Sequence, residues 1–167
     1  GDGSPRLTAY EYQGLLGSAC FVKGGAERPL TCLTCHSMHD GDPRGMIREE
    51  NRSDAPCLGC HGAFAEPSAL AKHTGHAAGS AGSRCYACHM PRVVYGVMAV
   101  HRTHLVRVPD PWLTAGKGVP NACSQCHVDR SLEWAVAASR RLWPARFASA
   151  PPLPAGFDVP EAPRALF

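Results

Sequence analysis

The clearest periodic pattern lies near the C-terminal end, where apolar residues recur every three or four positions over residues 129–143. Three larger apolar residues, with alanines between them, form this stripe: Leu132, Val136 and Leu142. Asp129 or Ser131 can cap the start of a helix here, and Pro144 ends it. The pattern therefore predicts an amphipathic helix that packs one face on the rest of the domain.

Turn-forming residues dominate the rest of the chain. Gly (17) and Pro (15) make up almost a fifth of the 167 residues, and aromatic residues only 7%. This composition favours many turns, short helices and little sheet. Six prolines fall within residues 144–167, which predicts an extended tail on a domain formed by residues 1–143. We expect Phe147, Phe157 and Phe167 to anchor this tail on its own domain or on a neighbouring subunit.

Charge and hydropathy argue against two kinds of partner. The formal net charge is +3 with neutral histidines, and there is no basic run of the kind that binds nucleic acid. No stretch reaches the roughly 18 consecutive apolar residues of a membrane-spanning helix, so we expect no transmembrane segment.

Eight of the nine cysteines belong to four copies of one motif, CxxCH. The copies consist of Cys32, Cys35 and His36; Cys57, Cys60 and His61; Cys85, Cys88 and His89; and Cys123, Cys126 and His127. Two thiols three residues apart can bond to the two vinyl groups on one porphyrin edge, and the next residue can direct an imidazole at the iron. The motifs therefore predict four covalently attached haem c groups.

Zinc sites and redox dithiols also use paired cysteines, but both fit this chain less well. Zinc chemistry does not require a histidine directly after each CxxC pair. A thioredoxin-like dithiol would occur once and in a βαβ context, and the chain has neither feature. Cys20 lies outside the motifs. We interpret it as a small buried apolar side chain, with a reactive thiol or an intermolecular disulfide as the alternatives.

A residue that commonly caps helices precedes each motif. These residues are Thr31, Asp54, Ser83 and Asn121. Pro56 and Pro120 lie beside two of them and also favour a helix start. We therefore expect each motif to occupy the first turn of a short helix.

Each six-coordinate iron needs a second axial ligand, and the chain has enough histidines to supply one. Five histidines lie outside the motifs: His39, His73, His76, His101 and His104. Four are required, so bis-histidine ligation of all four irons leaves one histidine over. Methionine is the rival ligand. With enough histidines present, we interpret the four methionines as packing residues: Met38, Met46, Met90 and Met98.

The spacing of His36 and His39 limits which iron each can bind. Residues three apart on a helical turn share one face, whereas two axial ligands approach a haem from opposite sides. His39 should therefore reach a different iron from His36 and bring two haems close together. His73 and His76 have the same spacing and are expected to serve two separate haems.

Further segments accompany the motifs in a specific order. They are SACFVKG, LTCLTCHSMHD, CLGCH, HTGHAAGS, CYACHMP, HRTHLVRVP and PNACSQCHVDRSLEWA. Together, from about residue 13 to residue 138, they resemble a bacterial multihaem c-type cytochrome domain of the doubled CxxCH type. Members of this family often carry names related to ammonia-forming nitrite reductase. A looser similarity, in size and architecture, is to the tetrahaem cytochromes that polymerise into extracellular nanowires.

The resemblance carries two implications about the sites. It implies distal ligands at His39, His73, His76 and His104, since the family often has arginine at the place of His101. The active haem of ammonia-forming nitrite reductase uses a lysine in CxxCK, and this chain has no such copy.

These features predict a multihaem cytochrome c fold that is mostly irregular, with short α-helices, little or no β-sheet, and haems forming the core. The expected function is one-electron transfer along the haems, with no catalytic residues. The alternatives are a nitrite- or hydroxylamine-type oxidoreductase with one open haem, and a soluble periplasmic shuttle. We expect redox proteins or further copies of the chain as partners, in a homo-oligomer or filament. Because haem is attached to CxxCH outside the bacterial cytoplasm, we expect a secreted protein, periplasmic or extracellular.

Overall fold

The computed structural model describes residues 11–25, 29–39, 46–95 and 99–153. The α-helices in this part of the chain are α1 (Glu11–Leu16), α2 (Ala19–Gly24), α3 (Cys32–Cys35), α4 (Ala55–Leu58), α5 (Pro67–Thr74), α6 (Cys85–His89), α7 (Trp112–Lys117) and α8 (Leu132–Leu142). Single 3₁₀ turns are η1 (Glu49–Asn51), η2 (Gly62–Phe64), η3 (Ala81–Ser83) and η4 (Cys123–Gln125). Met98, Phe157 and Phe167 lie outside the described residues.

A two-stranded antiparallel hairpin is the only sheet among the described residues. Strand β1 (Arg92–Tyr95) pairs with β2 (Ala99–Arg102), and Val93 lies opposite His101. The predicted fold class, mostly irregular with short helices and little sheet, is confirmed.

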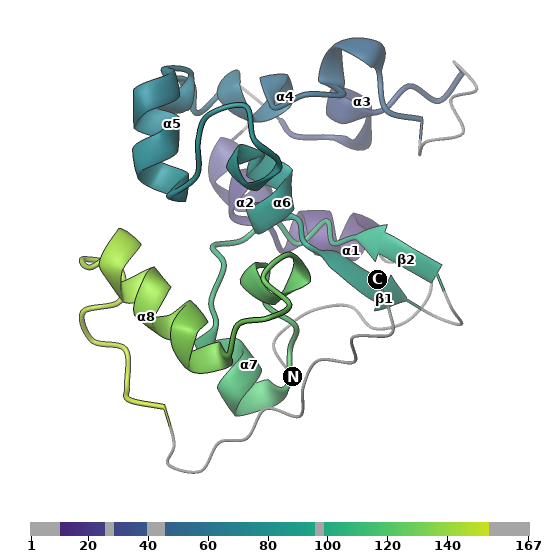
Figure 1. Ribbon diagram of the computed structural model, residues 1–167. Coiled ribbons are helices and arrows are strands. Elements are labelled where there is room, and N and C mark those ends of the chain that lie inside the picture. Colours follow the sequence, from purple (N-terminus) through teal and green to yellow (C-terminus); the bar gives the residue numbers. More distant parts are fainter. Residues whose placement is uncertain (1–10, 26–28, 40–45, 96–98, 154–167) are drawn as a thin grey trace.

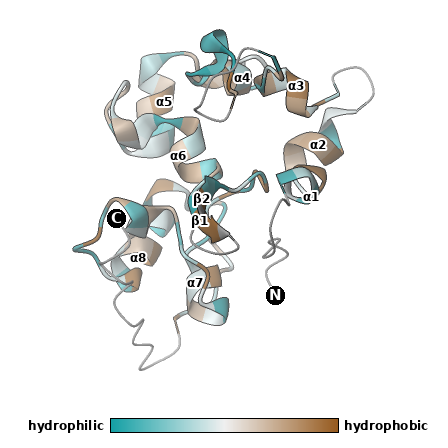
Figure 2. Ribbon diagram, turned by 90° about the vertical axis from the view of Figure 1, so that its right-hand side faces the viewer, coloured by the Kyte–Doolittle hydropathy of each residue, from teal (hydrophilic) through white to brown (hydrophobic). Residues whose placement is uncertain are grey.

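The helices after α2 form an upper and a lower group. In Figures 1 and 2, α3, α4 and α5 lie at the top, α7 and α8 lie at the bottom, and α6 and the hairpin lie between them. Helix α8 contacts both α5 and α7. The helices of the first two motifs therefore lie side by side at the top, and the helix of the third motif lies below them.

Few large apolar side chains are buried in the described part of the chain. The buried hydrophobic residues are Leu15, Val119, Leu132, Ala135, Val136, Ala138 and Phe147. Four of them lie on α8, and Figure 2 shows apolar colour spread over separate helices. The described side chains thus form a small core around α8.

Helix α8 has the extent that its apolar stripe predicts. Ser131 is its cap, since the Ser131 hydroxyl accepts a hydrogen bond from the Trp134 N–H at 3.3 Å. The carboxylate of Asp129, the other candidate, lies 3.2 Å from the Arg130 guanidinium. The helix ends at Leu142, two residues before Pro144.

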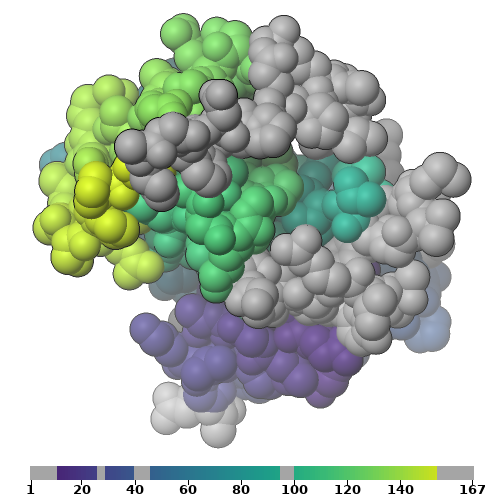
Figure 3. Space-filling model, turned by 90° about the horizontal axis from the view of Figure 1, so that it is seen from below, coloured from purple at the N-terminus to yellow at the C-terminus, as the bar shows by residue number. Residues whose placement is uncertain are grey.

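The first part of the proline-rich segment folds back on α7 and α8. Phe147 is buried and stacks on Trp112, with ring centroids 4.8 Å apart. The Trp112 indole N–H donates to the Pro151 carbonyl at 2.8 Å, and Arg140 donates to the same carbonyl at 3.0 Å. Figure 3 shows residues up to 153, in yellow, against the green surface of these helices.

Helix α1 lies close to the backbone that carries His104. A Cβ atom on Gly14 would be 2.9 Å from the Leu105 nitrogen and 3.1 Å from the His104 carbonyl carbon. Glycine at position 14 therefore allows α1 to approach the segment after β2. Ser18, which is fully buried, fixes the corner between α1 and α2 by donating to the Leu15 carbonyl at 2.7 Å.

Candidate haem sites

Each CxxCH motif begins on a short helical turn. The first motif starts α3, the third forms α6 and the fourth starts η4, so these three occupy a first turn as expected. The second motif begins in the last two residues of α4 and continues beyond it. In the first, second and fourth motifs the histidine N–H donates to the carbonyl of the first cysteine at 2.9 Å. This bond closes one turn of helix, so the histidine and the first cysteine project from the same side of the turn.

Two of the predicted capping residues help to close the start of a motif turn, Thr31 at the N-cap of α3 and Asn121 one residue before the N-cap of η4, Ala122. At the first motif the Thr31 N–H donates to the Thr34 hydroxyl at 3.0 Å, which closes the start of α3. At the fourth motif the Asn121 side-chain oxygen accepts from the Ser124 N–H at 3.0 Å. These contacts fix the motif backbones locally.

The other two capping predictions need correction. Ser83 does not cap α6, because its hydroxyl donates to the Ser80 carbonyl at 2.9 Å and the residue before the helix is Arg84. Asp54 does stand at the N-cap position of α4, but its side chain does not cap that helix. Its carboxylate instead accepts from the Cys85 N–H at 3.0 Å, in the third motif.

Three motif histidines each lie against one histidine from elsewhere in the chain. The ring centroids are 6.0 Å apart for His36 and His104, 6.2 Å for His89 and His73, and 5.9 Å for His127 and His76. The angles between the ring planes are 26°, 3° and 34° in the same order. The histidines thus meet in pairs that each combine one motif member with one non-motif member.

The separation within these pairs fits a metal ion between two imidazoles. A metal–imidazole bond is about 2.0–2.1 Å long and a ring centre lies about 1.1 Å behind its nitrogen, so two imidazoles on opposite sides of one metal have centres about 6.2 Å apart. Direct stacking of two rings would allow centroids as close as about 4.5 Å. The observed distances match the metal-bridged spacing.

Hydrogen bonds to backbone carbonyls orient one ring of each pair. The Nδ1–H groups donate from His89 to Arg107 at 2.9 Å, from His76 to Thr74 at 2.8 Å and from His104 to Arg102 at 3.2 Å. A proton held on Nδ1 leaves Nε2 as the nitrogen with a free lone pair. Each of the three pairs therefore contains one imidazole whose Nε2 can bind a metal.

Burial also favours the neutral form of two of these rings. It is the largest cause of the lowered pKa of His73, and the charge of His89 adds to the effect. Burial likewise lowers the pKa of His104. Since only neutral imidazole has a lone pair for iron, both shifts favour ligation.

Trp143, the residue after α8, and Phe64 of η2 flank His73. The Trp143 indole N–H donates to the His73 carbonyl at 2.9 Å, and the two rings lie 6.2 Å apart. Phe64 lies on the same imidazole at 4.5 Å. Similarly, Trp134 of α8 lies 4.6 Å from the ring of His127. The helix predicted from the apolar stripe therefore contacts the third and fourth histidine sites.

The second motif is the exception to this pairing. Among the residues that the structure describes, His61 and His39 form no such ring pair. His39 lies next to the range 40–45, which is outside the described residues, and its N–H donates to the Ser37 hydroxyl at 3.4 Å. His101 lies on β2.

Cysteines of the first three motifs interact with one another. No disulfide forms, and all nine cysteines are free thiols. Burial raises the pKa of Cys57 to about 12, and the thiols of Cys85 and Cys35 contribute to the rise. The second motif therefore lies near both the first and the third.

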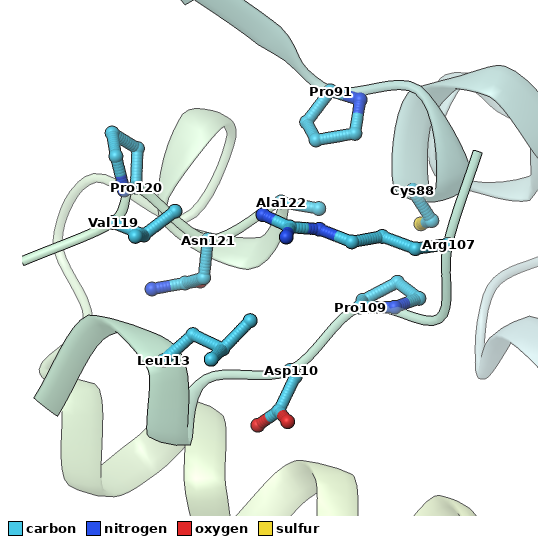
Figure 4. Close-up of a pocket in the computed structure, with 10 residues that line it drawn as sticks. All are labelled: Cys88, Pro91, Arg107, Pro109, Asp110, Leu113, Val119, Pro120, Asn121 and Ala122. Carbon is cyan, nitrogen blue, oxygen red and sulfur yellow. The ribbon is translucent and has the colours of Figure 1, made fainter. Parts of the chain in front are cut away.

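The third and fourth motifs are also close. Burial raises the pKa of Cys88 to about 11, with the thiols of Cys123 and Cys126 adding to the effect. A shallow hollow lies at this junction, lined by Cys88, Arg107 and Ala122 among others. Figure 4 shows the Arg107 side chain extending across the hollow towards Ala122, the residue before the fourth motif.

Two classes of feature are not found in the described residues. No group of three or more His, Cys, Asp or Glu side chains converges there as a metal cluster. Nor does any helix in this part of the chain have the length and apolar character to cross a membrane.

Residues 22–66 match a family model described as the doubled CXXCH motif. The match covers the first two motifs and is consistent with a multihaem c-type cytochrome domain. Comparisons with curated proteins and with solved structures gave no match.

Proposed function

We propose that the chain is a tetrahaem c-type cytochrome that relays single electrons, with every iron held between two imidazoles. The three histidine pairs at 5.9–6.2 Å support this most strongly. The doubled CXXCH match supports the coarser statement, a multihaem c-type cytochrome in electron transfer.

In this proposal the motif residues hold the porphyrins. Each cysteine would form a thioether by addition of its S–H across a vinyl C=C bond, and the motif histidine would bind the iron. His104 would supply the second imidazole for the first motif, His73 for the third and His76 for the fourth. Bound haem iron supplies reversible one-electron oxidation and reduction.

His39 is the remaining candidate for the second motif. The shared helical face expected for His36 and His39 is not found, because α3 ends at Cys35 and His36 has an extended backbone. His104 is already opposite His36 in the first pair, so His39 is available for another iron. The three pairs use six of the nine histidines, and His61 is the motif histidine of the second iron. Only His39 and His101 are then left as its second ligand. The resemblance implies His39, and we assign it to the iron of His61.

This assignment gives two short segments a bridging role. His36 and His39 would each hold one of the first two irons, and His73 and His76 would hold the third and fourth. Because each segment spans only four residues, it fixes a short distance between two haems. Irons with both axial positions occupied would accept and pass electrons without binding a substrate.

An oxidoreductase with one open haem is the alternative. It requires an iron with a vacant axial position, and His61 is the motif histidine that lacks a partner ring among the described contacts. Haem-loaded protein would distinguish the two functions. Intact mass spectrometry should give four haem adducts per chain, and the ferric spectrum should contain only low-spin iron.

Two histidine variants test the assignment of His39 to the second iron. His39→Ala should convert one of four irons to the high-spin form, whereas the control His101→Ala should leave all four low-spin. High-spin iron in the unaltered protein would support the oxidoreductase instead. Fewer than four haem adducts would contradict the tetrahaem proposal.

We further propose that the protein acts outside the cytoplasm, because c-type haem attachment takes place there. A periplasmic shuttle and a filament subunit both fit this location. Electron microscopy of the purified protein distinguishes them, since a shuttle gives separate particles and a filament subunit gives fibres.

A further inference from the structure

Asp54 is a buried carboxylate that none of the assignments above uses. It is 8% exposed, although an unpaired aspartate is seldom buried. It stands three residues before Cys57, at the start of α4. A buried carboxylate needs hydrogen-bond partners, and Asp54 contacts backbone N–H groups of two different motifs.

The backbone of Asp54 starts the turn of the second motif. Its carbonyl accepts from the Cys57 N–H at 3.0 Å and from the Leu58 N–H at 2.9 Å. Its side chain starts the turn of the third motif, because Oδ1 accepts from the Cys85 N–H at 3.0 Å. One residue thus fixes the first cysteine of both motifs, although these cysteines are far apart in the sequence.

The environment of Asp54 is electrostatically distinct. Its Oδ2 lies 3.7 Å from the Arg84 guanidinium, which is 41% exposed, whereas the Asp54 side chain is 10% exposed. Both Cys57 and Cys85 also feel the carboxylate, which contributes to the raised pKa of each thiol after burial. The mostly buried Asp54 carboxylate therefore faces both thiols. Water screens the charge of Arg84, because the Arg84 side chain is more exposed than that of Asp54.

We propose that Asp54 is a positioning residue that joins the attachment edges of the second and third haems and keeps a negative charge at their junction. This inference rests on the proposed tetrahaem function. Joined edges would place the porphyrins of Cys57 and Cys85 side by side, for direct electron exchange. A buried anion stabilises the ferric form over the ferrous form, so Asp54 would lower both reduction potentials.

Two substitutions separate charge from position. Asp54→Asn keeps an oxygen that can accept from the Cys85 N–H but removes the charge, and Asp54→Ala removes both. The matched control is Asp129→Asn, an equivalent charge loss beside the fourth motif at a carboxylate that is 69% exposed. Arg84→Gln removes the cation and should shift the potentials the opposite way.

The test is a spectroscopic redox titration of haem-loaded protein with intact mass and haem circular dichroism on the same samples. Asp54→Asn should raise the midpoint potential of one or two of the four haems. The expected size is about a tenfold change in the redox equilibrium constant, which is about 59 mV for one electron. Asp54→Ala should also weaken the circular dichroism that arises from coupled porphyrins. Asp129→Asn should change neither.

Two results would overturn the inference. Unchanged potentials in Asp54→Asn with four haems attached would reject the charge effect. Unchanged haem circular dichroism in Asp54→Ala would reject the positioning role. The unaltered protein is measured before any variant is made. A haem count other than four, or high-spin iron in that protein, would reject the tetrahaem proposal itself.

Discussion

Gly82→Ala should dislodge the proposed second ligand of the fourth iron. Gly82 lies in η3, and its backbone is not in the left-handed region, so an alanine can adopt the same φ and ψ. A Cβ atom at this position would lie 2.7 Å from His76 Cγ and 2.8 Å from Nε2, and it would contact Cδ2 as well. The methyl group would therefore enter the space of the imidazole.

The smallest movement that relieves this clash follows from these distances. Ordinary van der Waals contact begins at 3.4 Å, so clearing Cγ alone requires the ring to retreat by about 0.7 Å, and clearing the closer Cδ2 requires more. Crowding of this kind typically costs about 1–3 kcal/mol. A bond of about 2.0 Å between metal and imidazole cannot lengthen by that amount and persist. We therefore expect the fourth iron to lose His76 and become high-spin.

Ferric electron paramagnetic resonance and carbon monoxide binding to the reduced protein measure this outcome. Gly82→Ala should show one high-spin iron in four and bind carbon monoxide at one site. The matched control is Gly62→Ala, in the 3₁₀ turn η2, where an added Cβ meets nothing within 4 Å. Four low-spin irons in Gly82→Ala would refute the placement of His76 beside the fourth iron.

Three further predictions concern the stability of α8 and of its contact with the end of α5, each measured as the shift in denaturant midpoint of the haem-loaded protein. Gly75→Ala should destabilise by roughly 1–2 kcal/mol, because φ is +71° and the new Cβ would lie 2.9 Å from Leu142 Cδ2; an unchanged midpoint would contradict the close approach. Trp143→Phe should cost about 1 kcal/mol through loss of the 2.9 Å hydrogen bond to the His73 carbonyl, and a neutral result would mean that water replaces it. Ser131→Ala should cost about 1 kcal/mol through loss of the α8 cap, whereas a loss of several kcal/mol would indicate a wider role.

Local features of the fold could be predicted from the sequence. The turns of the first and fourth motifs follow from Thr31 and Asn121, whereas the capping residues expected for the second and third motifs act differently. Helix α8 follows from an apolar stripe with a serine before it. The hairpin was not predicted from the sequence. Valines nevertheless recur in RVVY and AVHR, on either side of residues 96–98. Such short β-branched runs were a signal that could have found it.

The histidine pairs and the role of Asp54 could not be predicted in the same way. Counting ligands predicts four distal histidines, but the pairing of His36 with His104 joins segments that are far apart in the sequence. Asp54 precedes Cys57 and so looked like a local cap. Its side chain binds Cys85 instead, and a contact between distant segments leaves no periodic pattern in the sequence.

A crystal structure of the haem-loaded protein, with iron located by anomalous scattering, tests the central proposal most directly. We predict one iron between His36 and His104, one between His89 and His73, one between His127 and His76, and one between His61 and His39. An iron with an empty axial position, or a metal bound by cysteine sulfur in place of porphyrin, would contradict the proposal.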